Sequence, residues 1–127
     1  MAGQPIFAKD TAPPLGPYSP GMRAGDMVFV SGTLALDAEG AVVGLGDVKA
    51  QTRRVLESIR SVLEAAGGGL EDIVSNAIFL KDLADFRDMN EAYAEYFGRN
   101  PPARYCIRAD LPKADCLVEI ASTAYLG

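Results

Sequence analysis

Apolar residues recur along this 127-residue chain with two different periods, and these periods predict its elements. One helix is predicted over 47–66, where a single stripe at helical spacing comprises Val48, Val55, Ile59, Val62 and Ala66. A second is predicted over 83–97, with the stripe Leu83, Phe86, Met89 or Asn90, Tyr93 and Phe97. Short apolar runs bounded by turn residues predict strands over 27–36, 41–43, 73–80, 105–109 and 116–126.

Both predicted helices have recognisable ends. Asp47 is a candidate N-cap of the first helix, and the triple glycine 67–69 ends it. Asp82 is a candidate N-cap of the second helix, which ends at Gly98. Because the triple glycine follows a helix and no Gly-Lys-Ser/Thr comes after it, a phosphate-binding loop is excluded.

The order of these elements predicts one α+β domain spanning 1–127, with a mixed sheet and both helices on one face. The strand 73–80 is mostly apolar, and we expect it to be buried on both faces over most of its length. The run 117–126 also has apolar residues on both faces. We therefore expect a homo-oligomer in which a second copy covers the side of the sheet without helices.

Two local features have more than one interpretation. Ser31-Gly32 interrupts the strand 27–36, which indicates a bulge or a close approach of a ligand to the backbone. The proline-rich segment 13–20 is too stiff for a helix or a central strand. Its Tyr18 either lines a pocket or covers apolar surface as part of a strap.

Composition and charge exclude several classes of protein. With 49% hydrophobic and 23% charged residues, the chain is typical of ordinary globular proteins. The net charge of -5 argues against a nucleic-acid-binding groove. No run reaches the length of a membrane span and no signal segment is recognised, so we expect a cytoplasmic protein.

The chain contains no histidine, and this excludes Ser-His-Asp and Cys-His hydrolysis. A catalytic zinc site is disfavoured for the same reason, and we expect no metal or cofactor. Cys106 and Cys116 are expected to be reduced, buried thiols. A nucleophilic Cys106 whose thiolate is stabilised by Arg104 is the alternative.

The stretch 103–121 contains the most unusual charged residues. Arg104 precedes one apolar run, and Glu119 lies inside another, where burying a carboxylate without a partner is costly. One interpretation is a structural ion pair or a half-exposed strand. The other is a site in which Arg104 binds a substrate carboxylate and Glu119 handles a water or a proton. Burial raises the pKa of such a carboxyl and a nearby arginine lowers it, so the sequence leaves the net direction open.

Several short motifs, taken in order, resemble the reactive-intermediate deaminase (Rid, formerly YjgF-type) family over about 11–125. They are Gly16-Pro17-Tyr18, Val30-Ser31-Gly32, Ala50-Gln51-Thr52-Arg53, Met89-Asn90-Glu91-Ala92-Tyr93, Pro102-Ala103-Arg104 with Cys106, and Val118-Glu119-Ile120. The stretches 30–35, 49–53, 93–95 and 103–107 are most similar to the branch called RutC. Tyr105, an aromatic residue after the arginine, fits that branch, whereas Tyr18 fits the general family.

This resemblance implies a chorismate-mutase-like fold and a trimer with a central barrel and clefts between subunits. It implies that Arg104 binds the substrate carboxylate and Glu119 positions the attacking water. Tyr18, Ser31 and Tyr105 would line the cleft, and the backbone at Gly32 and Cys106 would meet the ligand.

The implied activity is deamination of 3-aminoacrylate in pyrimidine breakdown, without a cofactor. Deamination of 2-aminoacrylate or 2-aminomuconate is the nearest alternative. A non-catalytic ligand-binding or chaperone-like role is the alternative of another class. A ribonuclease is disfavoured by the acidic charge and the missing histidine.

Overall fold

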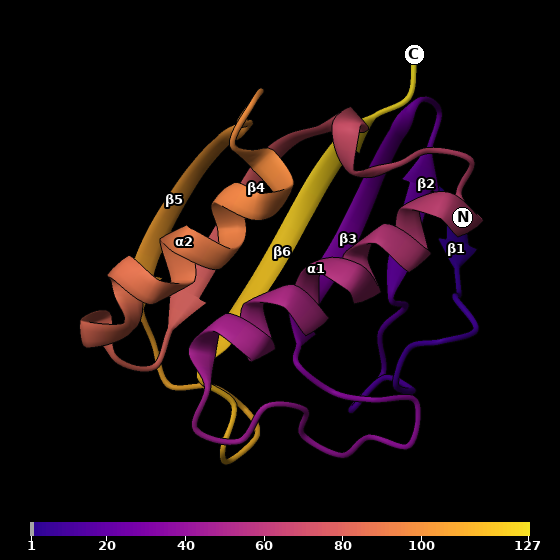
Figure 1. The fold of residues 1–127 in the computed structure, drawn as a ribbon. Coiled ribbons are helices and arrows are strands. Elements are labelled where there is room, and N and C mark those ends of the chain that lie inside the picture. Colours follow the sequence, from indigo (N-terminus) through magenta and orange to yellow (C-terminus); the bar gives the residue numbers. More distant parts are fainter. Residues whose placement is uncertain (1) are drawn as a thin grey trace.

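A mixed sheet in the order β1-β2-β3-β6-β4-β5 is the frame of the protein, seen in a computed structural model that describes residues 2–127 (Figure 1). Its strands are β1 (Gln4–Ile6), β2 (Gly21–Ala24), β3 (Met27–Leu34), β4 (Ile73–Leu80), β5 (Ala103–Arg108) and β6 (Val118–Tyr125). Only β4 and β5 pair in parallel, and the other neighbouring strands are antiparallel.

Two α-helices, α1 (Val48–Ala65) and α2 (Phe86–Phe97), lie on the same face of this sheet (Figure 1). Between them and the sheet lies the core, where Leu56, Ile59, Ile78 and Ile120 are fully buried. The predicted α+β arrangement, a mixed sheet with both helices on one face, is confirmed.

The ends of α1 agree with the sequence. The Asp47 carboxylate accepts a hydrogen bond from the Ala50 amide at 3.1 Å, and Gly67 has a φ of 94°, which favours glycine. The second helix differs, because Asp82 caps a short 3₁₀ turn (Leu83–Asp85) and α2 begins only at Phe86. A 3₁₀ turn has fewer residues per turn, so the apolar stripe changes phase there and Leu83 is exposed.

The strand predictions were correct for the central strands and wrong at one edge. β4 has the predicted bounds, and the register of β3 shifts between Val30 and Thr33, which confirms a bulge at Ser31-Gly32. The sequence analysis missed β1 and β2, which are three and four residues long and too short for a periodic signal. The segment 41–43 forms only an isolated bridge between Val42 and Leu36.

Burial of β4 on both faces is not seen in the single chain. The side of the sheet without helices is open, and its large apolar side chains Phe29, Tyr105, Ile107 and Tyr125 are 47–55% exposed. Two helices cover one face only, and the second face stays exposed to solvent in the single chain. We refer to this side as the open face.

Gln51 of α1 ties two loops to the helix. Its side chain is completely buried, and its Nε2 donates to the carbonyls of Gly44 and Asp115 at 3.2 and 2.9 Å. Its Oε1 accepts a hydrogen bond from the Leu117 amide at 2.7 Å. The helix therefore determines where β6, which carries Glu119, enters the sheet.

Gln51→Met keeps the length of the side chain but removes all three hydrogen bonds. Because it leaves buried backbone groups without partners, we expect a loss of about 2–3 kcal/mol in the free energy of unfolding, measured by urea denaturation. Gln4→Met is the matched control, because Gln4 is exposed on the edge strand β1. Equal effects of the two substitutions would contradict the role given to Gln51.

Candidate functional site

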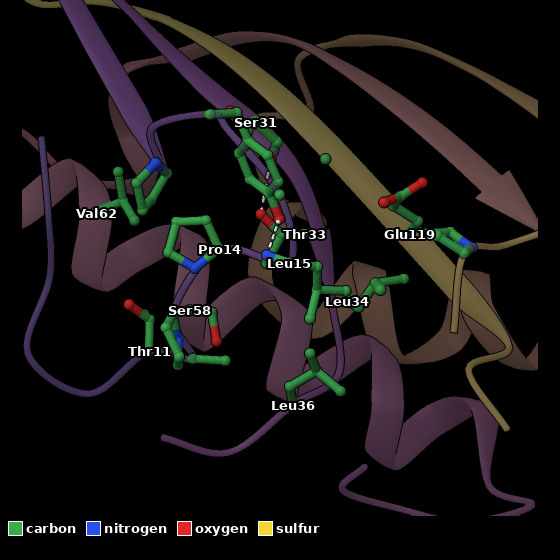
Figure 2. Close-up of a pocket in the computed structure, with 17 residues that line it drawn as sticks. Thr11, Pro14, Leu15, Ser31, Thr33, Leu34, Leu36, Ser58, Val62 and Glu119 are labelled. Carbon is green, nitrogen blue, oxygen red and sulfur yellow. Dashed lines mark hydrogen bonds between the residues drawn. The ribbon is translucent and has the colours of Figure 1, made fainter. Parts of the chain in front are cut away.

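A cavity of about 480 Å³ lies between the proline-rich segment and the bulged strand β3 (Figure 2). The predicted site residues Tyr18, Ser31, Gly32 and Glu119 all line it. Ser58 and Val62 of α1 and the apolar residues Leu34 and Leu36 also line the cavity. Most of its lining is apolar. The structure thus brings together four residues from three separate parts of the sequence.

The proline-rich wall is fastened at both ends. Arg54 donates to the carbonyl oxygens of Asp10 and Leu36 at 2.6 and 2.8 Å. At the other end the Ser31 hydroxyl donates to the Ser19 carbonyl at 2.7 Å. Tyr18 lies on the inner side of this wall, and its phenol oxygen accepts a hydrogen bond from the Leu15 amide. The interpretation in which Tyr18 lines a pocket therefore agrees with its position in the structure.

Gly32 allows the Glu119 carboxylate to lie against β3. A Cβ atom at position 32 would be only 2.9 Å from Glu119 Oε2. A side chain there would displace the carboxylate, so the absence of a side chain at position 32 is a steric requirement of this arrangement. The close approach that the sequence indicated at this point is made by the protein's own carboxylate.

Glu119 is half-buried, and burial raises the pKa of its carboxyl group. No ion pair of Glu119 occurs among residues 2–127. The net direction that the sequence left open is therefore upward in the single chain, because no cation opposes the effect of burial.

Arg104 lies on the other face of the sheet from Glu119. In the register, Arg104 and Ser122 both pair with Asn76, whereas Glu119 pairs with Phe79, three positions further along β4. Side chains alternate between the faces of a strand, so positions separated by three residues point to opposite sides. An ion pair between Arg104 and Glu119 in one protomer is therefore ruled out, and so is a common cavity within that protomer.

On the helix side, Arg104 borders a smaller cavity of about 270 Å³ beneath the end of α2. Its guanidinium donates to Asn90 Oδ1 at 2.6 Å and lies 4.8 Å from the centre of the Tyr93 ring. The aromatic spacing of the predicted helix indicated packing for Tyr93 and left Asn90 as an alternative to Met89 in the stripe, so this contact was not predicted. The available signal was the polar Asn90 within an otherwise apolar helical stripe.

The remaining predicted residues lie on β5. Burial raises the pKa of the Cys106 thiol, and the Arg104 charge offsets this only in part, so a thiolate nucleophile is not favoured. Cys106 and Cys116 are not joined in a disulfide, and Cys116 is buried as expected, whereas Cys106 is only partly buried. Tyr105 lies on the open face, where its ring meets Phe79 edge to face, and it borders neither cavity.

These features define an α+β protein with a half-buried carboxyl group in a cavity beside a bulged strand. The model of the family described as Endoribonuclease L-PSP matches residues 9–126. The chain belongs to this family, which is the Rid (YjgF) family indicated by the sequence motifs. No helix within residues 2–127 has the length and apolar character needed to cross a membrane.

Individual relatives are similar over nearly the whole chain. A protein of Acinetobacter baylyi named 3-aminoacrylate deaminase RutC is 49% identical, over 99% of this chain and 100% of its own length. The crystal structure of RidA from an Antarctic Psychrobacter is 35% identical with a TM-score of 0.89, covering 96% of this chain and 98% of that one. The structure of E. coli TdcF with bound serine is 32% identical with a TM-score of 0.90, covering 98% and 99%.

The raised pKa of Glu119 predicts a specific dependence of stability on pH. The folded protein holds this proton more tightly than the unfolded chain, so the stability contribution of Glu119 falls as the pH rises above its ordinary value of 4.5. Glu119→Gln cannot ionise. We therefore expect its free energy of unfolding, relative to that of the wild type, to increase between about pH 4 and about pH 7.

Chemical denaturation across this pH range measures the effect, and Glu39→Gln on an exposed turn is the control. A wild-type protein that gains stability relative to Glu119→Gln as the pH rises would contradict burial as the dominant influence.

Proposed function

We propose that the protein is an enamine/imine deaminase that hydrolyses 3-aminoacrylate, or a similar small enamine acid, to a carbonyl acid and ammonia, and that it acts in pyrimidine catabolism. The observation that carries the proposal is the Glu119 carboxyl group, half-buried at a cavity wall without an ion-pair partner among residues 2–127. The name of the 49% identical relative supports the choice of substrate.

The chemistry suits a chain without histidine. An enamine acid takes up a proton at carbon and becomes an imine, whose carbon is electrophilic, particularly when the nitrogen is protonated. Water adds to that carbon, the water loses a proton, and the resulting carbinolamine expels ammonia to leave the carbonyl group. Glu119 accepts the proton of the attacking water, and a carboxyl pKa raised by burial favours this role at neutral pH.

Arg104 supplies the second part of the mechanism from another protomer. Its planar guanidinium matches a substrate carboxylate, which fixes the position of the imine carbon. Because Arg104 and Glu119 occupy opposite faces of one sheet, a small substrate reaches both only where two copies meet. The apolar open face provides the contact surface, and the family resemblance suggests a trimer with a central barrel.

In this assembly, Tyr18 and Ser31 wall the cleft near Glu119, and the Gly32 backbone lies beside it. The backbone of Cys106 comes from the same strand as Arg104 and meets the ligand from the neighbouring copy, and Tyr105, on the open face, lies where the copies make contact. The family description names an endoribonuclease, but a net charge of -5 and the absence of histidine support a small anionic substrate over RNA.

Ammonia release from 3-aminoacrylate, 2-aminoacrylate and 2-aminomuconate tests the activity and ranks the substrates. We expect Arg104→Ala to raise KM at least about tenfold, because it removes a charge-assisted contact to the carboxylate. We expect Glu119→Gln to lower kcat by about 100-fold with KM little changed, because it removes only the base. A Glu119→Gln variant with full activity would favour a non-catalytic binding role, and an unaffected Arg104→Ala variant would disprove the carboxylate contact.

Mixed oligomers test whether the site lies between protomers. When Arg104→Ala and Glu119→Gln chains are co-expressed in equal amounts, sites that combine an intact Arg104 with an intact Glu119 from different copies form by chance. At substrate concentrations well below KM, we expect about a quarter of the wild-type rate per site, measured as ammonia release, whereas each variant alone gives about a tenth of that rate or less. Mixed oligomers no more active than the average of the two variants alone would contradict the proposed assembly.

A further inference from the structure

A row of polar side chains crosses the sheet beneath α2. Ser122, Asn76 and Arg104 lie side by side on β6, β4 and β5, because Asn76 pairs in register with both of the others. Asn76 is completely buried and Ser122 is nearly so, next to the buried apolar core residues Ile78 and Ile120. Polar groups in such positions cost free energy unless they are hydrogen-bonded.

Hydrogen bonds run from Ser122 through Asn76 to Tyr93, with each residue donating to the next. The Ser122 hydroxyl donates to Asn76 Oδ1 at 2.6 Å, and Asn76 Nδ2 donates to the Tyr93 phenol oxygen at 2.9 Å. The first bond fixes which end of the Asn76 amide points toward α2. The second bond then fixes the phenol end of Tyr93, a buried residue of that helix.

Tyr93 in turn supports the Arg104 side chain. The guanidinium carbon lies 4.8 Å from the centre of the Tyr93 ring and 5.8 Å from that of Phe86, and Asn90 Oδ1 accepts a hydrogen bond from it. All of these partners are neutral, and no carboxylate forms an ion pair with Arg104 within residues 2–127. Aromatic faces and an amide oxygen hold a guanidinium while leaving its charge available to an anion.

We propose that Ser122, Asn76 and Tyr93 are positioning residues that hold the Arg104 guanidinium in the orientation in which it receives the substrate carboxylate. This inference rests on the proposed function of Arg104. Two parallel N–H groups bind a carboxylate only when the guanidinium plane is correctly oriented. A tilt of that plane weakens the carboxylate contact without affecting Glu119, which lies on the other face of the sheet.

Tyr93→Phe tests the phenol and keeps the ring. Loss of the phenol oxygen leaves Asn76 Nδ2 without its acceptor, so the Tyr93 ring is no longer held by a hydrogen bond from Asn76. We expect KM to rise about tenfold with kcat nearly unchanged, and we expect the inhibition constant of acrylate, an unreactive small carboxylate, to rise in parallel. Acrylamide, which lacks the carboxylate, serves as the comparison inhibitor and should show no such change.

Tyr96→Phe is the matched control, because it makes the same change on the same helix. The Tyr96 hydroxyl donates to Glu57 at 2.9 Å and is not part of the row. Equal KM values for Tyr93→Phe and Tyr96→Phe would overturn the proposal, whatever their melting temperatures. A rise in KM that accompanies a loss of oligomeric mass would also overturn it.

A second pair of variants separates the effect of the hydrogen bond from Ser122 to Asn76 from the effect of packing at position 122. Threonine and valine have nearly the same shape, so Ser122→Thr and Ser122→Val add similar volume, but only threonine keeps the hydroxyl that bonds to Asn76. We expect Ser122→Thr to retain the wild-type KM and Ser122→Val to raise it. Equal KM values in this pair would show that the row is only structural.

Arg104→Ala distinguishes a failure of the positioning role from a failure of the proposed function of Arg104. If Arg104→Ala raises KM but Tyr93→Phe does not, only the positioning role fails. If Arg104→Ala has no effect on KM or on acrylate inhibition, the proposed function of Arg104 fails and the positioning role fails with it.

Discussion

The alternation of side chains along β4, β5 and β6 is the constraint on which the rest of this structure depends. Arg104 and Glu119 are the two charged residues of the proposed site, and the strand register, which is regular from Asn76 to Leu80 of β4, places them on opposite faces of one sheet. One face is covered by α1 and α2, and the other is open and apolar. The same geometry that separates the two side chains in one chain creates the surface by which copies can meet.

Buried polar residues support both halves of the proposed site. Gln51 connects α1 to the loop before β6, and so determines the position of Glu119. Asn76 and Ser122 connect the sheet to Tyr93 of α2, next to Arg104. A buried side-chain amide thus links α1 to the strand that carries Glu119, and another links the sheet to the part of α2 that contacts Arg104. Such arrangements cost free energy in a core, and their satisfied bonds specify one arrangement of neighbouring elements.

The environments of the two charged groups also differ in a way that suits separate roles. Glu119 has lost part of its solvation without gaining a cation among residues 2–127, so burial raises the pKa of its carboxyl group. Arg104 is held by aromatic rings and an amide oxygen, with no carboxylate paired to it in the same described part of the chain. In the proposed mechanism, Glu119 as base and Arg104 as anion-binding group need neither histidine nor a metal for the addition of water to an imine.

Local sequence patterns were enough to predict the α+β class, the bounds of β4, the cap of α1 at Asp47, the bulge at Ser31-Gly32 and membership of the family, because periodicity, capping and motif order are local properties. It also singled out Tyr18, Ser31, Gly32 and Glu119, which the fold assembles around one cavity. Tertiary structure alone decided the pairing of the short strands β1 and β2, the contacts of Asn90 and Tyr93 with Arg104, and the face on which Arg104 lies. Those properties depend on the register between strands distant in sequence, and no local pattern encodes that register.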